Sequence, residues 1–311
     1  MGEKRYAIGI DLGGTNLRIA LVSREGELIR KIKEPTPETL LESVRERTGT
    51  LISDEVAGIG LGIAGLIGRA ERRVLISPNL HAVEKIDLVG GLEEKFGLPV
   101  VLENDANAAA AGEQWVGAGR GLSSFVLLTL GTGIGGGIVH GGELLGIAAE
   151  IGHMSIVGDG EKCGCGNYGC LELYASAKAI LARASAALES GRESVLRSYC
   201  GGNFYKLTTE DIHRAAFDGD GLARELLKNA GRHLGIGIAN IVNLMSPEAV
   251  ILTGGLTGAW DLYVQEAIKE ASRRALRELF DDVRIVPSTL KDDAGIVGAA
   301  GLVFRSVGIK A

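Results

Sequence analysis

One histidine and three cysteines lie close together near the middle of the chain. They are His153, Cys163, Cys165 and Cys170, within the stretch E-I-G-H-M-S-I-V-G-D-G-E-K-C-G-C-G-N-Y-G-C-L-E. Imidazole and thiolate are the ligands that tetrahedral Zn²⁺ takes in proteins. A disulfide or unpaired buried thiols are the alternative, but three cysteines at this short spacing suit a metal better. The pattern predicts a structural zinc site that orders a loop.

Two carboxylates, Glu150 and Glu172, stand at the two ends of this segment. Four ligands already complete a tetrahedral site, so neither carboxylate is needed for the metal. We therefore expect Glu150 and Glu172 to have a separate function.

Two glycine-rich turns each follow an apolar run. They are D-L-G-G-T-N (11–16) and G-T-G-I-G-G-G (131–137). Successive backbone amides in such turns bind anions, and a carboxylate at the strand end can hold a hydrated Mg²⁺ beside phosphates. An ordinary hairpin is the alternative for the first turn. A glycine pair at 254–255, after V-I-L-T, is either a third point of close backbone approach or a simple turn.

The second turn also satisfies G-x-G-x-x-G through Gly131, Gly133 and Gly136. This pattern binds dinucleotides only where a helix follows, and I-V-H-G-G-E is not helix-like, which disfavours a nicotinamide enzyme. The chain has no G-x-x-x-x-G-K-[ST] motif, which disfavours a Walker-type NTPase. It shows no serine nucleophile elbow, and the clustered cysteines are assigned to zinc.

Asp105 is the best candidate general base. It follows the apolar run P-V-V-L-E and begins a stretch of small residues with helical character. In open α/β sheets, function collects at the carboxyl ends of strands. A helix cap without chemistry is the alternative for Asn104-Asp105. Two phosphate-type turns, a carboxylate and a polar zinc loop together predict phosphoryl transfer to a hydroxyl.

The elements that position these residues alternate between strand and helix, which predicts an α/β fold. We expect strands at 5–10, 17–22, 56–65, 99–103, 125–130, 249–256 and 283–287. We expect helices at 37–52, 84–96, 106–115, 173–190, 208–218, 221–245, 261–279 and 294–304. Strand, glycine turn and strand occur at 6–22 and again at 125–140. This repeat predicts two related α/β halves facing each other across a cleft.

Composition narrows the class of protein. The chain has 311 residues, 47 of them glycine, and its net charge of −6 disfavours a nucleic-acid groove. Four cysteines, three of them in one metal-like cluster, fit a reducing cytoplasm. Asp11 interrupts the first apolar run, so no signal peptide is expected there. Residues 121–142 lack charged side chains, but their glycines favour strands and a turn over a membrane span. We expect a soluble, cytoplasmic protein.

The order of these motifs resembles the ROK family (repressors, open reading frames, kinases) of the actin-like hexokinase superfamily. The residues that carry the resemblance are G-I-D-L-G-G-T-N (9–16), E-N-D-A-N-A-A-A (103–110), T-L-G-T-G-I-G-G-G (129–137), E-I-G-H (150–153), C-G-C-G-N-Y-G-C-L-E (163–172) and L-T-G-G-L (252–256). Within the family, the segments after Asn104 and around Glu150 resemble the ATP-dependent glucokinases.

The resemblance implies two actin-like (ribonuclease H-like) α/β domains flanking a cleft, with a zinc-stabilised loop. The small domain is expected at 1–117 with 296–311, closed by the C-terminal helix. The large domain is expected at 118–295, with the zinc loop and a dimerisation surface. A homodimer or a dimer of dimers is implied, with a sugar and a nucleotide as ligands.

The implied reaction is ATP-dependent phosphorylation of glucose at its 6-hydroxyl, with Asp105 taking the proton. The implied sugar contacts are Gly65, Asn79, Asn104, Asp105, Glu150, His153 and Glu172. The implied phosphate-binding residues are Asp11, Gly13, Gly14, Thr15, Asn16, Thr132 and Gly133, with Asp11 near Mg²⁺. Gly254 and Gly255 would approach the adenosine, and His153, Cys163, Cys165 and Cys170 would bind zinc. One departure concerns Asn79, which lacks the tryptophan that often follows it in relatives.

Two alternatives stay open. The first is another sugar substrate, such as N-acetylmannosamine, N-acetylglucosamine, fructose or mannose, because the sequence does not show the volume of the pocket. The second is a sugar-sensing ROK regulator. It is the more distant one, because about five residues precede the first expected strand and a helix-turn-helix module would need more.

Overall fold

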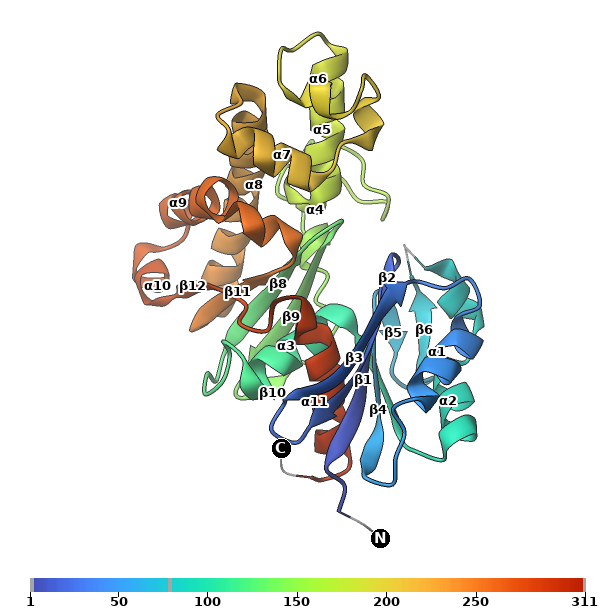
Figure 1. Cartoon of the computed structure of the whole chain (residues 1–311). Helices are drawn as coiled ribbons and strands as arrows, with labels where there is room; N and C mark the ends of the chain where they lie inside the picture. The colour runs from blue at the N-terminus through green and yellow to red at the C-terminus, as the bar shows by residue number, and fades with distance from the viewer. Residues whose placement is uncertain (1–2, 78–79, 310–311) are drawn as a thin grey trace. The chain divides into compact units, whose positions relative to one another are not determined.

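The computed structural model describes residues 3–77 and 80–309. The chain divides into two compact units. Figure 1 labels the helices and strands along the chain. The first unit contains residues 1–127, 137–149 and 288–311, and the second contains 128–136 and 150–287. The predicted domains differ from this division in segments 118–127, 137–149 and 288–295, which pack with the first unit because their contacts lie there.

The first unit is built on a five-stranded sheet with the order β3-β2-β1-β4-β7. The strands are β1 (Tyr6–Leu12), β2 (Asn16–Ser23), β3 (Leu28–Pro35), β4 (Val56–Ile63) and β7 (Val100–Asn104). β1 pairs antiparallel with β2 and parallel with β4, so the first glycine turn joins a hairpin while β4 and β7 arrive by crossovers. The carboxyl ends of β1, β4 and β7 therefore meet at one edge, where Asp11 and Asn104 lie.

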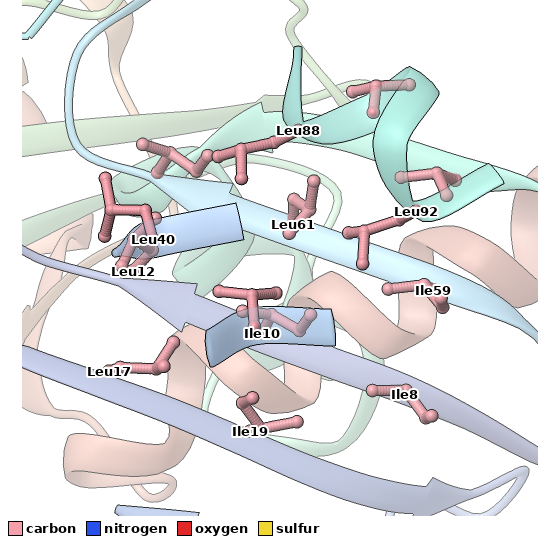
Figure 2. Packing of buried hydrophobic residues seen from close by; sticks show 14 of the residues in the cluster. Ile8, Ile10, Leu12, Leu17, Ile19, Leu40, Ile59, Leu61, Leu88 and Leu92 are labelled. Carbon is pink, nitrogen blue, oxygen red and sulfur yellow. The ribbon is translucent and has the colours of Figure 1, made fainter. Parts of the chain in front are cut away.

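Alternating residues of β1 divide between the two faces of this sheet. Figure 2 shows Ile8 and Ile10 on the face that packs against α1 (Leu40–Gly49) and α2 (Leu88–Phe96). On the other face, a Cβ at Gly9 would lie 1.9 Å from the carbonyl oxygen of Ile296 in α11 (Ala294–Ser306). Only glycine admits the α11 backbone at that distance.

The remaining elements of the first unit surround this framework. They are β5 (Leu66–Gly68), β6 (Arg73–Ile76), η1 (His81–Lys85), α3 (Asp105–Val116), β10 (Glu143–Leu144) and η6 (Lys291–Asp293). Helices α3 and α11 lie in backbone contact, because a Cβ at Gly298 would be 1.7 Å from the carbonyl oxygen of Ala108. The helix that begins with Asp105 is thereby fixed to the helix that begins beside Asp11.

A second five-stranded sheet has the order β10-β9-β8-β11-β12. Its strands include β8 (Phe125–Leu130), β9 (Ile134–His140), β11 (Ala249–Thr253) and β12 (Arg284–Pro287). Counted by their appearance in the chain, the strands of both sheets follow the order third, second, first, fourth, fifth. The predicted repeat of strand, glycine turn and strand is present in both sheets.

Helices of the second unit follow β9 and β11. They are η2 (Ile151–His153), α4 (Glu172–Ala175), α5 (Ala177–Glu189), α6 (Leu196–Tyr199), η3 (Phe204–Lys206), α7 (Thr209–Phe217), α8 (Gly221–Met245), η4 (Gly255–Ala259), the π-helical turn η5 (Trp260–Val264), α9 (Gln265–Arg274) and α10 (Arg277–Asp282). Gly231 and Gly235 lie against the backbone of the η5–α9 segment, since a Cβ at Gly231 would be 2.3 Å from the carbonyl oxygen of Tyr263. Close helix packing explains this glycine pair.

The expected elements agree with the structure except at a few places. β3 was not expected from the sequence, because six of its eight residues are exposed and four are charged. The helix expected at 84–96 begins only at Leu88, because the Asp87 side chain caps it. The helix expected at 173–190 is divided into α4 and α5, because Ser176 is extended and caps α5. The helix expected at 261–279 is divided into η5, α9 and α10. Within the described residues, no helix is both long and apolar enough to cross a membrane.

Candidate functional site

The four predicted zinc ligands come together in the second unit. Their ligand atoms all lie within 4.8 Å of one another. The Sγ atoms of Cys165 and Cys170 are 3.7 Å apart, and Cys163 Sγ is 3.7 Å from His153 Nδ1. All four cysteines of the chain are free. These distances are too long for a disulfide, whose sulfurs are bonded at about 2.0 Å.

The cluster fits a tetrahedral Zn²⁺. Zn–S bonds of about 2.3 Å place two sulfurs of such a site about 3.8 Å apart. Without a cation, burial and the neighbouring sulfurs raise the pKa of the Cys170 thiol to about 12. A bound cation is what would allow these thiolates to form together, so the donor set suits a metal. Zinc with four protein ligands holds a loop and leaves no open position for water.

The zinc loop is anchored to α5 and α8 by an aromatic stack. The Tyr174 ring stacks on His233 at 4.9 Å, and the Arg183 guanidinium lies 5.1 Å from the centre of the Tyr174 ring. The Tyr174 hydroxyl accepts a hydrogen bond from the Glu161 amide at 2.9 Å, and Arg183 pairs with the Glu161 carboxylate at 2.9 Å. These contacts hold the start of the cysteine segment.

The first glycine turn presents free donors. The Gly13 amide donates to the Asn16 carbonyl at 3.0 Å, and the Thr36 hydroxyl donates to the Gly13 carbonyl at 2.6 Å, which fixes the turn. The amides of Gly14 and Thr15 find no acceptor among the residues that the structure describes. Two adjacent exposed amides form the kind of nest that binds a phosphate.

Asp11 lies beside this turn in a charged setting. Burial raises its pKa above the ordinary value, and the nearby Asp292 and Asp293 add to the rise, while the ion pair with Arg18 opposes it. Arg18 Nη1 is 2.7 Å from Asp11 Oδ2. The start of α11 faces the carboxylate, since a Cβ at Gly295 would lie 3.4 Å from the Asp11 carboxyl carbon. A carboxylate in this setting suits a hard cation.

The second glycine turn leaves a similar pair of amides. Gly131 donates to the Gly133 carbonyl at 3.0 Å, and Gly135 donates to the Thr129 hydroxyl at 3.0 Å. The amides of Thr132 and Gly133 have no acceptor within the described part of the chain. These are the two residues that the resemblance assigns to phosphate.

The third turn lies at the end of β11 and opens onto a cavity. Gly254 has φ +97°, and a Cβ there would lie 2.4 Å from the Leu130 carbonyl oxygen, so the position requires glycine. The cavity of about 180 Å³ lies between this turn and helices α5, α7 and α8. Its lining residues are Ile180, Thr209, Glu210, Ile212, His213, Leu227, Gly255, Leu256, Gly258 and Ala259.

Asp105 is the first residue of α3, at the carboxyl end of β7. The cap of this helix is Asn104, whose Oδ1 accepts from the amides of Ala106 at 2.9 Å and Asn107 at 3.2 Å. Asp105 Oδ1 also accepts from the Ala106 amide at 2.9 Å, so Asn104 supplies most of the cap and Asp105 shares in it. The nearly buried Glu103 accepts from the Asn104 amide at 2.9 Å and from Asn107 Nδ2 at 3.0 Å, and it pairs with Arg69.

Gly65 and Asn104 are brought together, because Asn104 Nδ2 donates to the Gly65 carbonyl at 3.0 Å. Gly65 has φ +140°, and a Cβ there would lie 2.3 Å from the Ile76 carbonyl oxygen. Asn79, the other predicted sugar contact of this region, lies outside the described residues.

Glu150 and Glu172 lie on either side of the zinc cluster in the chain, and both belong to the second unit. Glu150 Oε2 is 4.0 Å from His153 Nε2, while the other ring nitrogen, Nδ1, faces Cys163. Glu172 is the first residue of α4, and its Oε2 accepts from the Ile134 amide at 3.0 Å. The two nitrogens of His153 thus face Cys163 and Glu150.

Two interactions of buried or half-buried carboxylates were not predicted from the sequence, one at Asp11 and one at Glu113. Arg18 pairs with Asp11 because the β1–β2 register sets the two residues opposite each other. Glu113, fully buried at the end of α3, accepts from the amides of Ala118 at 2.6 Å and Leu290 at 3.0 Å and from the Ser288 hydroxyl. No sequence signal predicts a pairing across so many residues.

Comparison with known proteins places this geometry in a family. A model described as the ROK family matches residues 7–306, and the chain belongs to that family. Glucokinase of Streptomyces coelicolor is 36% identical over 310 residues, which cover 95% of this chain and 96% of the relative. The xylose repressor of Caldicellulosiruptor bescii is 33% identical over 317 residues, covering 96% of this chain and 78% of the repressor.

Among solved structures, a ROK family glucokinase from Streptomyces griseus in complex with glucose and AMPPNP is similar to this chain. The TM-score is 0.86 at 34% identity, over 96% of this chain and 99% of the other. The expected α/β fold with two actin-like halves is therefore confirmed.

Proposed function

We propose that this chain is an ATP-dependent glucokinase that transfers the γ-phosphoryl group of ATP to the 6-hydroxyl of glucose. The observation that carries the proposal is the pair of glycine turns whose exposed amides, at Gly14 and Thr15 and at Thr132 and Gly133, have no acceptor within the described residues. Phosphoryl transfer depends mainly on holding and neutralising phosphates, which is what such amides supply. The similarity to glucokinases over nearly the whole chain selects the sugar kinase class.

Asp105 is the proposed general base. It would accept the proton of the sugar 6-hydroxyl as that oxygen attacks the γ-phosphorus and the bond to the β-phosphate oxygen breaks. It lies at the start of α3 and at the carboxyl end of β7, the place where function collects in open α/β sheets. A base of this kind contributes about 10²–10⁴ in rate.

The nucleotide is assigned to the three turns. Asp11, Gly13, Gly14, Thr15 and Asn16, together with Thr132 and Gly133, would hold the phosphates. Asp11 is the residue suited to a hydrated Mg²⁺, which would neutralise phosphate charge when bound. The adenosine is assigned to Gly254, Gly255 and the cavity beside them, where Glu210 and His213 offer polar groups.

The sugar hydroxyls are assigned to Gly65, Asn104, Glu150, His153 and Glu172, with Asn79 retained from the resemblance. His153 supports this assignment, because a metal at Nδ1 would leave Nε2 carrying a proton that it can donate. Carboxylates accept from sugar hydroxyls, and zinc would hold the loop that carries Glu150 and Glu172.

A sugar-sensing regulator is the competing function, because xylose repressors belong to the same family. The net charge of −6 favours the kinase, since proteins that bind nucleic acid usually carry a basic surface.

The proposal is tested by a coupled assay of ADP release across hexoses and N-acetylhexosamines, with ATP, GTP and polyphosphate as donors. We expect the highest kcat/KM with glucose and ATP. A higher kcat/KM for N-acetylmannosamine, N-acetylglucosamine, fructose or mannose would overturn the choice of sugar. Absence of sugar-dependent turnover with every donor would overturn the kinase assignment.

A further inference from the structure

The backbone of Ile134, within the second glycine turn (131–137), is held from both ends of the predicted zinc loop (150–172). Its amide donates to Glu172 Oε2 at 3.0 Å. Its carbonyl oxygen faces Gly152, where a Cβ would lie only 2.2 Å away. The segment before the histidine ligand and the segment after the last cysteine ligand therefore both pack on one residue of the turn.

A second contact holds the other end of the turn. The amide of Ala177, the first residue of α5, donates to the Gly131 carbonyl at 2.9 Å. Residues 172–177 thus fix the turn at Gly131 and at Ile134. Leu171, which precedes them, is fully buried, with Gly237 of α8 packed against it. The segment that grips the turn is itself fixed to the longest helix of the unit.

The Glu172 carboxylate lies directly against the turn. A Cβ at Gly133 would be 2.3 Å from Glu172 Oε2, so any side chain there would displace the carboxylate or the turn. Charge alone gives no reason for this arrangement, because a carboxylate repels phosphate. The hydrogen bond from the Ile134 amide to Glu172 explains the arrangement, because it orients the peptide that follows the free amides of Thr132 and Gly133.

We infer that Glu172 is a positioning residue for the phosphate turn, in addition to the sugar contact assigned above, so that nucleotide affinity depends on it even without sugar. This inference rests on the proposed function. When the carboxylate is removed, the Ile134 amide loses its acceptor, and the amides of Thr132 and Gly133 lose their fixed orientation. Binding would then have to restore an order that the wild-type turn already possesses.

The test is calorimetric binding of Mg²⁺-ADP in the absence of sugar, with wild type, Glu172→Ala, Glu172→Gln and Glu150→Ala. Glu172→Ala should weaken ADP binding roughly tenfold, the scale of one lost hydrogen bond to a charged acceptor. Glu172→Gln keeps an oxygen that can accept from Ile134, so its affinity should stay within about twofold of wild type. Glu150→Ala, which removes the other carboxylate of the loop, should also stay within about twofold.

Kinetics supply a second readout. Glu172→Ala should raise the KM for both ATP and glucose, whereas Glu172→Gln should raise mainly the KM for glucose. Zinc content and the unfolding midpoint, measured for each variant, check that the loop is intact.

Unchanged or tighter ADP binding by Glu172→Ala would overturn the inference, because it would mean that the carboxylate only repels phosphate. Equal weakening in Glu150→Ala would overturn it as well, since the effect would then belong to the loop rather than to Glu172. Neither result touches the proposed function, which stands or falls on sugar-dependent turnover by the wild-type protein.

Discussion

At the scale of the residue, the two neighbours Asn104 and Asp105 at the start of α3 matter most, because one is the helix cap and the other is the proposed base. Asn104 accepts from the helix amides, and Asp105 follows it at the carboxyl end of β7. Asn104 is thus the principal cap, and Asp105 adds one hydrogen bond, from the Ala106 amide to its own Oδ1 at 2.9 Å. The role of Asp105 as a base is therefore open to a direct test.

Asp105→Asn should lower kcat by about 10²–10⁴, because an amide cannot accept the proton of the attacking hydroxyl. Sugar affinity, measured by calorimetry, should stay within a few-fold of wild type, because the amide can still hydrogen-bond a hydroxyl. Near-normal turnover in this variant would show that Asp105 is not the base.

Cys165→Ser should lose zinc and weaken sugar binding, because the metal would no longer fix the loop between Glu150 and Glu172. Metal analysis and glucose calorimetry measure the two effects. Cys200→Ser is the matched control, since Cys200 is buried outside the cluster, next to the Leu196 carbonyl oxygen, and should leave zinc content unchanged. Purified wild type without zinc would contradict the assignment of the cluster.

At this scale, an interaction could be predicted when its residues lie close together in the sequence. The four predicted zinc ligands lie within eighteen residues, and their types and spacing predicted the His/Cys cluster that the structure brings together. The bond from Ile134 to Glu172 spans 38 residues and joins a turn to a helix start. Periodicity carries no information on such a pair, because its geometry arises only when β9 and α4 have folded together.

At the scale of the element, α8 connects the helices of the second unit to the zinc loop. Its N-cap is Asp220, whose side chain accepts from the Ala223 amide at 2.8 Å and the Val195 amide at 2.9 Å. Burial pushes the pKa of Asp220 upward, but these hydrogen bonds outweigh it and hold the pKa below its ordinary value of 3.8.

A depressed carboxylate pKa gives stability that is present above the unfolded-state pKa and is lost as the pH falls through the folded-state pKa. Asp220→Ala should therefore cost about 1 kcal/mol at pH 7, and the difference from wild type should shrink below about pH 4. Urea unfolding at both pH values measures this. A penalty that stays the same at low pH would show that the ionised cap contributes nothing.

Element prediction succeeded where sequence periodicity and burial agree. Helix α8 begins and ends at the expected residues 221 and 245, and its buried residues Leu227, Leu234 and Ile241 recur at helical spacing. β3 was missed because its apolar residues Leu28, Ile29 and Ile32 do not alternate with its charged ones, although its backbone pairs with β2 and Ile32 packs against the core. The interruption of the helix expected at 261–279 was not predicted. The π-helical turn η5 lies where the Tyr263 backbone approaches Gly231 of α8, a contact between segments distant in the sequence.

At the scale of the molecule, the two sheets share one strand order although their sequences share little beyond a glycine turn. The repeated turn predicted this relation, because a glycine turn between two apolar strands is a local feature that survives sequence divergence. The unit boundaries were not predictable to the residue. Segment 288–290 packs with the first unit through Glu113, a contact between α3 and a segment far along the chain.

The central claim concerns which atom receives the phosphoryl group. Phosphorus NMR of a reaction with glucose, ATP and Mg²⁺ identifies the product directly. We predict equal amounts of ADP and glucose 6-phosphate, and none of the latter with Asp105→Asn on the same timescale. Release of inorganic phosphate with ADP, or phosphate on another hydroxyl, would contradict the account.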